Sequence, residues 1–371
     1  MIAATMISNI HLTALAFFPK ITYRRYQKLA DCFADPGRLW QAEFGELTRA
    51  GMEEEICHEF LVWRETNSPE HFAKILEDEK INAVSLADPT YPRLLKEIND
   101  PPRVLFYRGR LPDENRPALA VVGTRRMTPY GAQVCAELVE DLARRGLTIV
   151  SGLALGLDGA AHRAALKANG QTIAVLGSSV DRNHIYPPAH QRLAEEIIAS
   201  HGGVLSEYPP GFEPTTYSFP ARNRVIAGLT LGTLIIEAPE RSGALITAKC
   251  ALDYNREVFA VPQPINSLAG EGANNLIKLG ARPVTKAEDV IETLNLKGLD
   301  QMVSTGQIPT LTENEKIVFD ALTRQPEYID AITKKTGLAS AMVNSALATL
   351  EIKDLAKNFG GMRYAKTAAV A

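Results

Sequence analysis

Five short apolar runs, each ending near a glycine, serine or proline, constrain the fold of this 371-residue chain more than any other feature. Most of them are followed by a stretch with helical periodicity. Nearly continuous β-branched runs that alternate with helices are typical of a parallel sheet that is covered on both faces. The sequence therefore predicts an α/β fold with a doubly wound, mostly parallel sheet within residues 81–296. The runs are 118–122, 147–150, 172–176, 233–236 and 258–261.

The residues before this region predict a small helical domain over residues 1–76. Short helical patterns are separated there by Phe18-Pro19, Asp35-Pro36-Gly37 and Gly51, which are typical helix breakers. A SAM-like or helix-hairpin-helix DNA module is one interpretation. Acidic residues slightly outnumber basic ones in this part, so a docking or packing role is favoured.

The residues after it predict a winged-helix domain over residues 310–371. A capping-box pattern at 312–315 begins one helix, two further helical patterns cover 328–336 and 340–350, and the Gly360-Gly361 turn joins two apolar flanks. Helices that read DNA usually carry basic side chains, and the last of these helices has no Lys or Arg. Contact with another protein is therefore favoured for this domain.

Charge and cysteine usage exclude several classes of protein. The chain has 40 Lys and Arg against 43 Asp and Glu, a formal charge of −3, so any nucleic-acid binding depends on local clusters of basic side chains. The four cysteines form no CxxC pair, and we expect neither a zinc site nor a disulfide framework. No apolar run reaches the ~18 residues of a membrane span, and the first residues lack the pattern of a signal peptide. We therefore expect a cytoplasmic protein.

The first glycine turn, Gly123-Thr124-Arg125, follows the run 118–122. It lacks the GxGxxG pattern of a dinucleotide-binding turn, so no nicotinamide cofactor is expected. A glycine that permits close approach, a hydroxyl donor and a guanidinium at the start of a helix are suited to binding a phosphate. The alternative is an ordinary turn with a solvated arginine.

The second turn, Ser151-Gly152, leads into a helix rich in small residues. Asp158 and His162 stand four residues apart in that helix, as a metal-binding or acid–base pair would. A third ligand at metal-site spacing is missing from this motif. We therefore favour an Asp158 side chain that bonds to its own backbone or to His162.

The segment from Thr215 to Gly228 combines aromatic and basic residues and contains no acidic one. Single-stranded nucleic acid offers bases for stacking and phosphates for charge, so Phe219 together with Arg222 and Arg224 suits such a ligand. The alternative is that Tyr217 and Phe219 are buried while the two arginines bond to carbonyls at the edge of the sheet. The two interpretations are compatible.

Two further segments follow. Arg241-Ser242-Gly243 lies at the expected start of a helix, where free backbone amides can bind another phosphate. The segment from Gly270 to Asn275 follows the last apolar run, and we interpret it as a loop at the rim of the site.

Taken together, the turns resemble the DNA-processing protein A family, DprA, also called Smf. Each matching segment is weak by itself, whereas the ordered combination is specific. The succession of helical, Rossmann-like and winged-helix (DML1-like) parts is also similar. Two positions depart from the family pattern. Ser178-Ser179, in the third turn, which follows the run 172–176, replaces a glycine that is usual there, and His190 stands where asparagine is usual. The matching segments are Gly123-Thr124-Arg125, Ser151 to Ala154 with Gly156, Asp158 and His162, Phe219 to Gly228, and Arg241-Ser242-Gly243 with Leu245-Ile246-Thr247.

The resemblance implies a protein that is not an enzyme and has no cofactor. It implies binding of single-stranded DNA, homodimers in the cytoplasm, protection of incoming DNA and loading of RecA recombinase onto it during natural transformation. The residues that it implies as DNA contacts are Gly123, Thr124, Arg125, Ser151, Gly152, Phe219, Arg222, Asn223, Arg224, Arg241, Ser242, Gly243 and Lys249.

Two other functions are compatible with these residues. A nucleotide-processing enzyme similar to the lysine-decarboxylase-like phosphoribohydrolases would use the same kind of turns, but the PGGxGTxxE pattern of that group is absent. The nearest acidic cluster is Glu237-Ala238-Pro239-Glu240. An interaction scaffold would dock partners through both end domains and dimerise through its centre.

Overall fold

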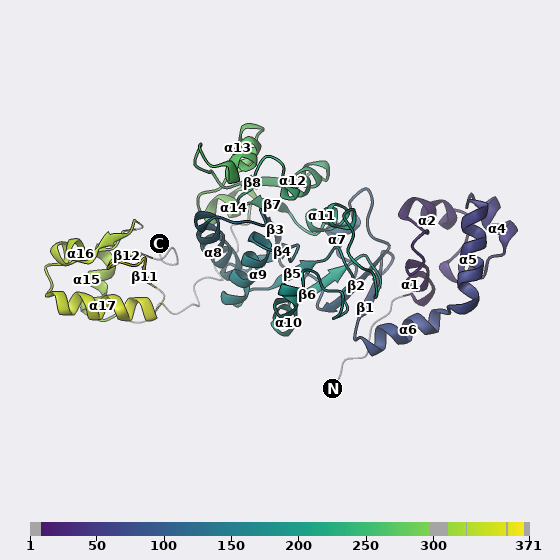
Figure 1. Ribbon diagram of the computed structural model, residues 1–371, viewed down its shortest axis with the longest axis horizontal. Helices are drawn as coiled ribbons and strands as arrows, with labels where there is room; N and C mark the ends of the chain where they lie inside the picture. Colours follow the sequence, from purple (N-terminus) through teal and green to yellow (C-terminus); the bar gives the residue numbers. More distant parts are fainter. Residues whose placement is uncertain (1–8, 297–310, 324, 354, 367–371) are drawn as a thin grey trace. The chain divides into compact units, whose positions relative to one another are not determined.

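The structure is a computed structural model that describes residues 9–296, 311–323, 325–353 and 355–366 (Figure 1). The described residues form two compact units, which divide between Lys297 and Gly298. The first unit contains the apolar runs and the glycine turns, and the second contains the C-terminal helices and hairpin.

Within residues 9–296, the centre of the first unit is a nine-stranded sheet in the order β1-β2-β6-β5-β4-β3-β7-β8-β9. Neighbouring strands are parallel from β6 across to β9, whereas β2 pairs antiparallel with both β1 and β6. This confirms the doubly wound, mostly parallel α/β fold. The strands are β1 (Asn82–Ser85), β2 (Val104–Gly109), β3 (Ala118–Val122), β4 (Thr148–Ser151), β5 (Thr172–Val175), β6 (Gly203–Ser206), β7 (Gly232–Ile235), β8 (Glu257–Ala260) and β9 (Arg282–Pro283).

Helices cover both faces of the sheet (Figure 1). One face packs against α7, α11, α12 and α13, and the opposite face packs against α10 together with α1 and α6 of the N-terminal segment. The segment that the sequence indicated as a rim loop is helical instead, because Gly270 ends a short 3-10 turn and α13 begins at Glu271. The helices after β1 are α7 (Arg93–Lys96), α8 (Pro129–Arg144), α9 (Leu157–Lys167), α10 (Gln191–Ala199), α11 (Ser218–Gly228), α12 (Gly243–Asp253), α13 (Glu271–Lys278) and α14 (Ala287–Thr293), with 3-10 turns at Pro188–His190 and Leu268–Gly270.

The N-terminal segment is helical, as its short helical patterns and the helix breakers between them predicted. Side-chain oxygens of Asn9, Thr22, Asp35 and Ser68 accept from backbone amides and cap four of the helices. The helices share an aromatic core, and the first unit includes them together with the sheet. The division of that unit into domains 1–76 and 81–296 stays a prediction. The helices are α1 (Ile10–Ala16), α2 (Tyr23–Ala30), α3 (Pro36–Gln41), α4 (Phe44–Arg49), α5 (Glu54–Thr66) and α6 (Pro69–Asp78).

The second unit is a winged helix. Its first helix begins at the predicted capping box, in which Thr312 and Glu315 each bond to the other's backbone amide. Gly337 adopts the left-handed conformation, with φ of 67°, and separates the next two helices. Its elements are α15 (Glu313–Ala321), β10 (Glu327–Tyr328), α16 (Ile329–Thr336), α17 (Ser340–Ile352), β11 (Ala356–Asn358) and β12 (Arg363–Lys366), and the strand order is β10-β12-β11.

The contact between the N-terminal helices and the sheet can be tested at Phe106. This β2 side chain is fully buried, and its ring meets the edge of Phe17 at a centroid distance of 5.8 Å. Phe106→Ala is expected to lower the free energy of unfolding by about 3–5 kcal/mol, because it leaves a cavity. Val62→Ala, at a side chain that is 65% exposed, should change it by less than about 0.5 kcal/mol. Urea denaturation measures both, and equal midpoints for the two variants would contradict the packing.

Candidate nucleic-acid interface

A pocket of about 490 Å³ lies at the carboxyl ends of the parallel strands, beside β3 and β7. These strands are neighbours, but the chain continues from β3 towards β6 in one direction and from β7 towards β9 in the other. At such a reversal the loops after two adjacent strands diverge and leave a crevice, which is where open α/β sheets bind ligands. The loop after β3, the loop after β7 and the starts of α11 and α12 form the walls.

Most of the DNA contacts implied by the resemblance line this pocket. They come from three segments that are far apart in the sequence, and the sheet topology brings them together. Their role in binding stays a prediction. The lining residues from that set are Gly123, Thr124, Arg125, Phe219, Arg222, Asn223, Arg241, Ser242 and Gly243.

Arg222 is almost fully buried in the pocket wall, with 5% of its surface exposed. Its Nη1 donates to the carbonyl oxygen of Gly152, at 2.6 Å, and to that of Val175, while its Nε donates to Oδ1 of Asn223 at 3.1 Å. Burial lowers the pKa of the guanidinium to about 10, so it stays charged at neutral pH. One side chain therefore joins the ends of β4 and β5 and fixes a positive charge beside the pocket.

Two exposed arginines add to this charge. The guanidinium of Arg125 lies 5.5 Å from the centroid of the Phe219 ring, a cation–π distance, and Arg241 lies in the loop after β7. The pocket also reaches the first residues of α12, whose cap is Ser242, and amides at a helix start carry partial positive charge. The combination provides cationic groups and an aromatic face within one cavity.

Asp158 of α9 is the acidic residue among those that line the pocket, and its carboxylate is occupied by backbone amides. Its Oδ2 accepts from the amide of Gly152 at 3.2 Å, and the amides of Gly123 and Ala154 also bond to it. Burial raises the pKa of Asp158, whereas Arg222 and these amides act in the opposite direction. The carboxylate thus ties together the loops after β3 and β4, a structural role as the sequence favoured, but the expected bond to His162 is wrong, because His162 bonds to Thr172 instead.

The remaining implied contacts do not line this pocket. Ser151 is buried and donates to the carbonyl of Val121 at 2.6 Å. Gly152 lines a smaller adjoining cavity of about 40 Å³. Lys249 is exposed on α12 and does not line either cavity.

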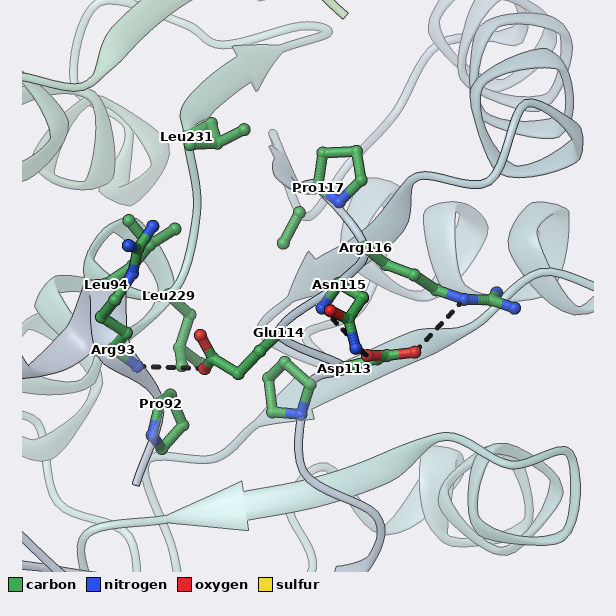
Figure 2. Close-up of a pocket in the computed structure, with 12 residues that line it drawn as sticks. Pro92, Arg93, Leu94, Asp113, Glu114, Asn115, Arg116, Pro117, Leu229 and Leu231 are labelled. Carbon is green, nitrogen blue, oxygen red and sulfur yellow. Dashed lines mark hydrogen bonds and ion pairs between the residues drawn. The ribbon is translucent and has the colours of Figure 1, made fainter. Parts of the chain in front are cut away.

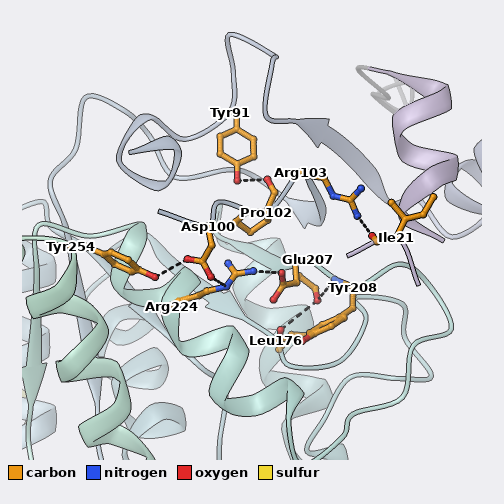
Figure 3. Close-up of polar contacts among 11 residues, drawn as sticks. Ile21, Tyr91, Asp100, Pro102, Arg103, Leu176, Glu207, Tyr208, Arg224 and Tyr254 are labelled. Carbon is orange, nitrogen blue, oxygen red and sulfur yellow. Dashed lines mark hydrogen bonds and ion pairs between the residues drawn. The ribbon is translucent and has the colours of Figure 1, made fainter. Parts of the chain in front are cut away.

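Arg224 is on the same helix as Arg222 but is directed towards Glu207 and Asp100 (Figure 3). Only 15% of its side chain is exposed, and the structure does not bring it to the pocket. The sequence pattern of closely spaced arginines did not distinguish these two directions, because α11 turns successive side chains to different faces.

Several functional candidates carry no strong sequence signal. Tyr186 lies beside Phe219, with ring centroids 5.5 Å apart, at the edge of the smaller cavity. Ile246 lines the main pocket and is 40% exposed. The sequence indicated Ile246 only through the segment Leu245-Ile246-Thr247, which matches the family pattern. Tyr217 is 84% exposed, so the alternative is wrong in burying it, but its expectation that Arg222 bonds to carbonyls at the sheet edge is confirmed.

Glu237, the acidic residue nearest to an enzymatic pattern, is fully buried and bonded. Its carboxylate accepts from the amide of Thr128 at 2.9 Å and from the hydroxyl of Thr128 at 2.8 Å. Thr128 caps α8, so Glu237 fixes the start of that helix. It does not line the pocket, and no observation here favours the enzyme hypothesis.

A second cavity, of about 150 Å³, lies at the opposite edge of the sheet, near the starts of β3 and β7 (Figure 2). Its carboxylates bond to nearby groups, because Glu114 accepts from the amide of Arg93 and Asp113 accepts from Asn115 and pairs with Arg116. Arg93 and Arg116 line this cavity together with the two carboxylates, and its lining includes no aromatic ring, unlike that of the main pocket.

Neither a metal cluster nor a membrane helix is found in the part of the chain that the structure describes. No three His, Cys, Asp or Glu side chains among residues 9–296, 311–323, 325–353 and 355–366 are grouped as metal ligands would be. No helix in these ranges is both long enough and apolar enough to cross a bilayer.

Comparison with known families assigns both units. The family model described as DNA recombination-mediator protein A matches residues 82–295, and that of the DprA winged helix domain matches residues 304–362. The chain belongs to the DNA recombination-mediator protein A family. This confirms the resemblance to DprA and Smf.

Curated relatives and solved structures agree with this family. Protein Smf of Synechocystis is 36% identical over 91% of this chain and 94% of its own length, and DNA processing protein DprA of Streptococcus pneumoniae is 45% identical over 60% and 76%. The X-ray structure of that pneumococcal DprA has a TM-score of 0.67 at 36% identity and covers 78% of this chain and 98% of its own. A structure of Helicobacter pylori DprA, which is described by its single-stranded DNA binding mode, has a TM-score of 0.52 at 33% identity, with 59% and 97% covered.

The burial of His162 on α9, the helix that also carries Asp158, can be tested by the dependence of stability on pH. It is fully buried, its Nδ1 lies 2.7 Å from Oγ1 of Thr172, and burial lowers its pKa to about 3. In the unfolded chain the pKa is about 6.5, so the unfolded state binds the additional proton and stability is lost as pH falls below about 6.5. When the pH falls from about 7.5 to about 5.5, the free energy of unfolding of the wild type should decrease by about 1.4 kcal/mol more than that of His162→Gln. Urea denaturation at both pH values measures this, and parallel losses would contradict the buried neutral histidine.

Proposed function

We propose that this protein binds single-stranded DNA in the pocket beside β3 and β7, protects incoming DNA and loads RecA recombinase onto it during natural transformation. The observation that carries the proposal is the convergence of three arginines, an aromatic ring and a helix start in one cavity at the carboxyl edge of the sheet. The Helicobacter pylori relative, which binds single-stranded DNA, supports the choice of ligand.

The chemistry of the pocket suits an unpaired strand rather than a duplex that is recognised through its base pairs. Arg125 and Arg241 are exposed and can each bond to a phosphate, while the buried Arg222 adds a fixed charge behind them. Phe219 and the nearby Tyr186 offer ring faces for bases, and stacking accepts any base. We therefore expect binding with little sequence preference and strong dependence on salt.

We further propose a cytoplasmic homodimer in which the helical segment 1–76 and the winged helix 310–371 contact proteins. Exposed aliphatic side chains near α13 support an association surface, with Ile265, Leu268 and Leu279 each at least 80% exposed. The exposed face of α17 has no basic residue, which supports contact with protein. Sedimentation velocity tests the dimer, and a monomer at all concentrations would exclude it.

Arg125→Ala is expected to weaken binding to labelled single strands roughly tenfold or more, because a hydrogen bond to a charged group contributes about 1.5–3 kcal/mol. The slope of log affinity against log salt should fall by about 0.7, since one phosphate contact is lost. The effect should be similar for strands of different sequence. Fluorescence anisotropy at several salt concentrations measures both quantities.

Arg192→Ala is the matched control, because its side chain is 93% exposed, carries the same charge and lies outside the pocket. This variant should bind like the wild type. If Arg125→Ala also binds like the wild type, the pocket is not the DNA site.

The RecA step is tested with the full chain on single-stranded DNA that is first covered by a single-strand binding protein. The wild type should shorten the lag before RecA hydrolyses ATP, and Arg125→Ala should do so only at higher concentration, because it binds the strand less tightly. A wild type that binds the strand and leaves the lag unchanged would exclude RecA loading while retaining DNA binding.

A further inference from the structure

Three charged side chains that do not line the pocket are grouped beside α11 (Figure 3), and the arginine and one of the two carboxylates are largely buried. We call Arg224, Glu207 and Asp100 the α11 anchor. Nη2 of Arg224 donates to Oε2 of Glu207 at 2.5 Å, and Nε of Arg224 lies 3.2 Å from Oδ2 of Asp100. Arg224 is therefore held by two carboxylates from different parts of the chain.

The α11 anchor connects several elements. Glu207 directly follows β6, and Asp100 lies in the connection between α7 and β2. The hydroxyl of Tyr254, which ends α12, donates to the other oxygen of Asp100 at 3.1 Å. A single side chain of α11 is thus bonded to groups whose positions are set by the sheet and by the neighbouring helix.

Arg103 covers this group from the N-terminal side. Its Nη2 donates to the carbonyl of Ile21, and its guanidinium lies 4.6 Å from the centroid of the Tyr26 ring. It interacts electrostatically with Glu207. Arg103 therefore connects the N-terminal helices to Glu207, whose side chain is 17% exposed.

Burial makes the α11 anchor sensitive to the loss of either partner. Burial lowers the pKa of Arg224, but Glu207, Asp100, Tyr254 and Tyr208 together raise it above its usual value, so the guanidinium is held in its charged form. A buried charge without its partner is strongly unfavourable, and the side chain would move towards water. Because Arg224 is on α11, we expect the loss of its partner to shift or loosen the helix.

The same helix carries three side chains of the pocket. Asn223 is adjacent to Arg224 in the sequence, and Arg222 and Phe219 precede it within the same helix. Arg222 bonds directly to carbonyl oxygens at the ends of β4 and β5, and a displaced helix cannot keep these hydrogen bonds. The position of α11 therefore decides whether the ring and the guanidinium face the cavity.

We propose that Arg224 and Glu207 are positioning residues for DNA binding: their buried ion pair sets the place of α11 and so keeps Phe219, Arg222 and Asn223 in the pocket. This inference rests on the proposed binding of single-stranded DNA. It gives Arg224 a role different from the phosphate contact that the sequence pattern indicated.

The experiment compares Glu207→Gln, Arg224→Met and the double variant with the wild type by anisotropy at several salt concentrations. Each single variant should lose roughly five- to twentyfold in affinity with an unchanged salt slope, because no phosphate contact is removed. The double variant should lose no more than the weaker-binding single variant, since the two residues act as a pair. Arg125→Ala, which should lower the slope, and Arg192→Ala, which should bind normally, are the references.

Hydrogen exchange without DNA provides a separate readout. Amides of residues 218–228 should exchange faster in Glu207→Gln than in the wild type. Thermal unfolding checks that each variant is folded at the temperature of the binding assay. If Glu207→Gln does not fold, Asp100→Asn replaces it, because the Asp100 side chain is 47% exposed and its loss should cause a smaller change in the same direction.

Three outcomes would overturn the proposal. The first is wild-type affinity in folded Glu207→Gln and Arg224→Met, whatever the exchange rates. The second is a salt slope that falls in Arg224→Met as it does in Arg125→Ala, which would assign Arg224 to a phosphate. The third is unchanged exchange of residues 218–228. Failure of the wild type to bind single strands would instead reject the proposed function, and the exchange rates would still report on the α11 anchor.

Discussion

The hydrogen bonds of Arg222 to the ends of two strands are the interaction on which the pocket depends. Parallel strands leave carbonyl oxygens at their carboxyl ends, and these need donors when the edge is covered. Arg222 supplies them to Gly152 and Val175 while it remains charged. The approach is close enough that a Cβ at position 152 would lie 2.6 Å from the guanidinium carbon, which explains the glycine in that turn.

The same arrangement sets the electrostatic character of the site. The carboxylate of Asp158 is occupied by backbone amides of the loops after β3 and β4, so it stabilises the turns and leaves the arginines of the pocket available. On the far side of α11, Arg224 is balanced by Glu207 and Asp100. Positive charge is therefore presented on the pocket side of the helix and neutralised on the other side.

The sequence predicted the strands with strong apolar runs to within about one residue, but it did not reveal β1, β2, β6 and β9. β6 is a four-residue strand that begins at Gly203 and ends at Ser206, and neither residue is typical of a strand. Tertiary pairing with β5 and β2 stabilises it instead. Gly270 to Asn275 was wrongly interpreted as a loop for a related reason, because its amides at Gly272 and Ala273 bond to the distant carbonyl of Ala238.

The amino-acid sequence by itself determined the parallel α/β class, the winged helix and the chemical nature of the site, because these follow from hydrophobic periodicity, turn residues and the ordered glycine and arginine segments. It could not determine which arginine of α11 faces the pocket. That depends on which groups lie on each side of the helix. Carbonyls at the ends of β4 and β5 lie on one side and Glu207 with Asp100 on the other, and only folding brings them there. A guanidinium on a buried helix is directed by its acceptors, and their positions are a property of the tertiary structure.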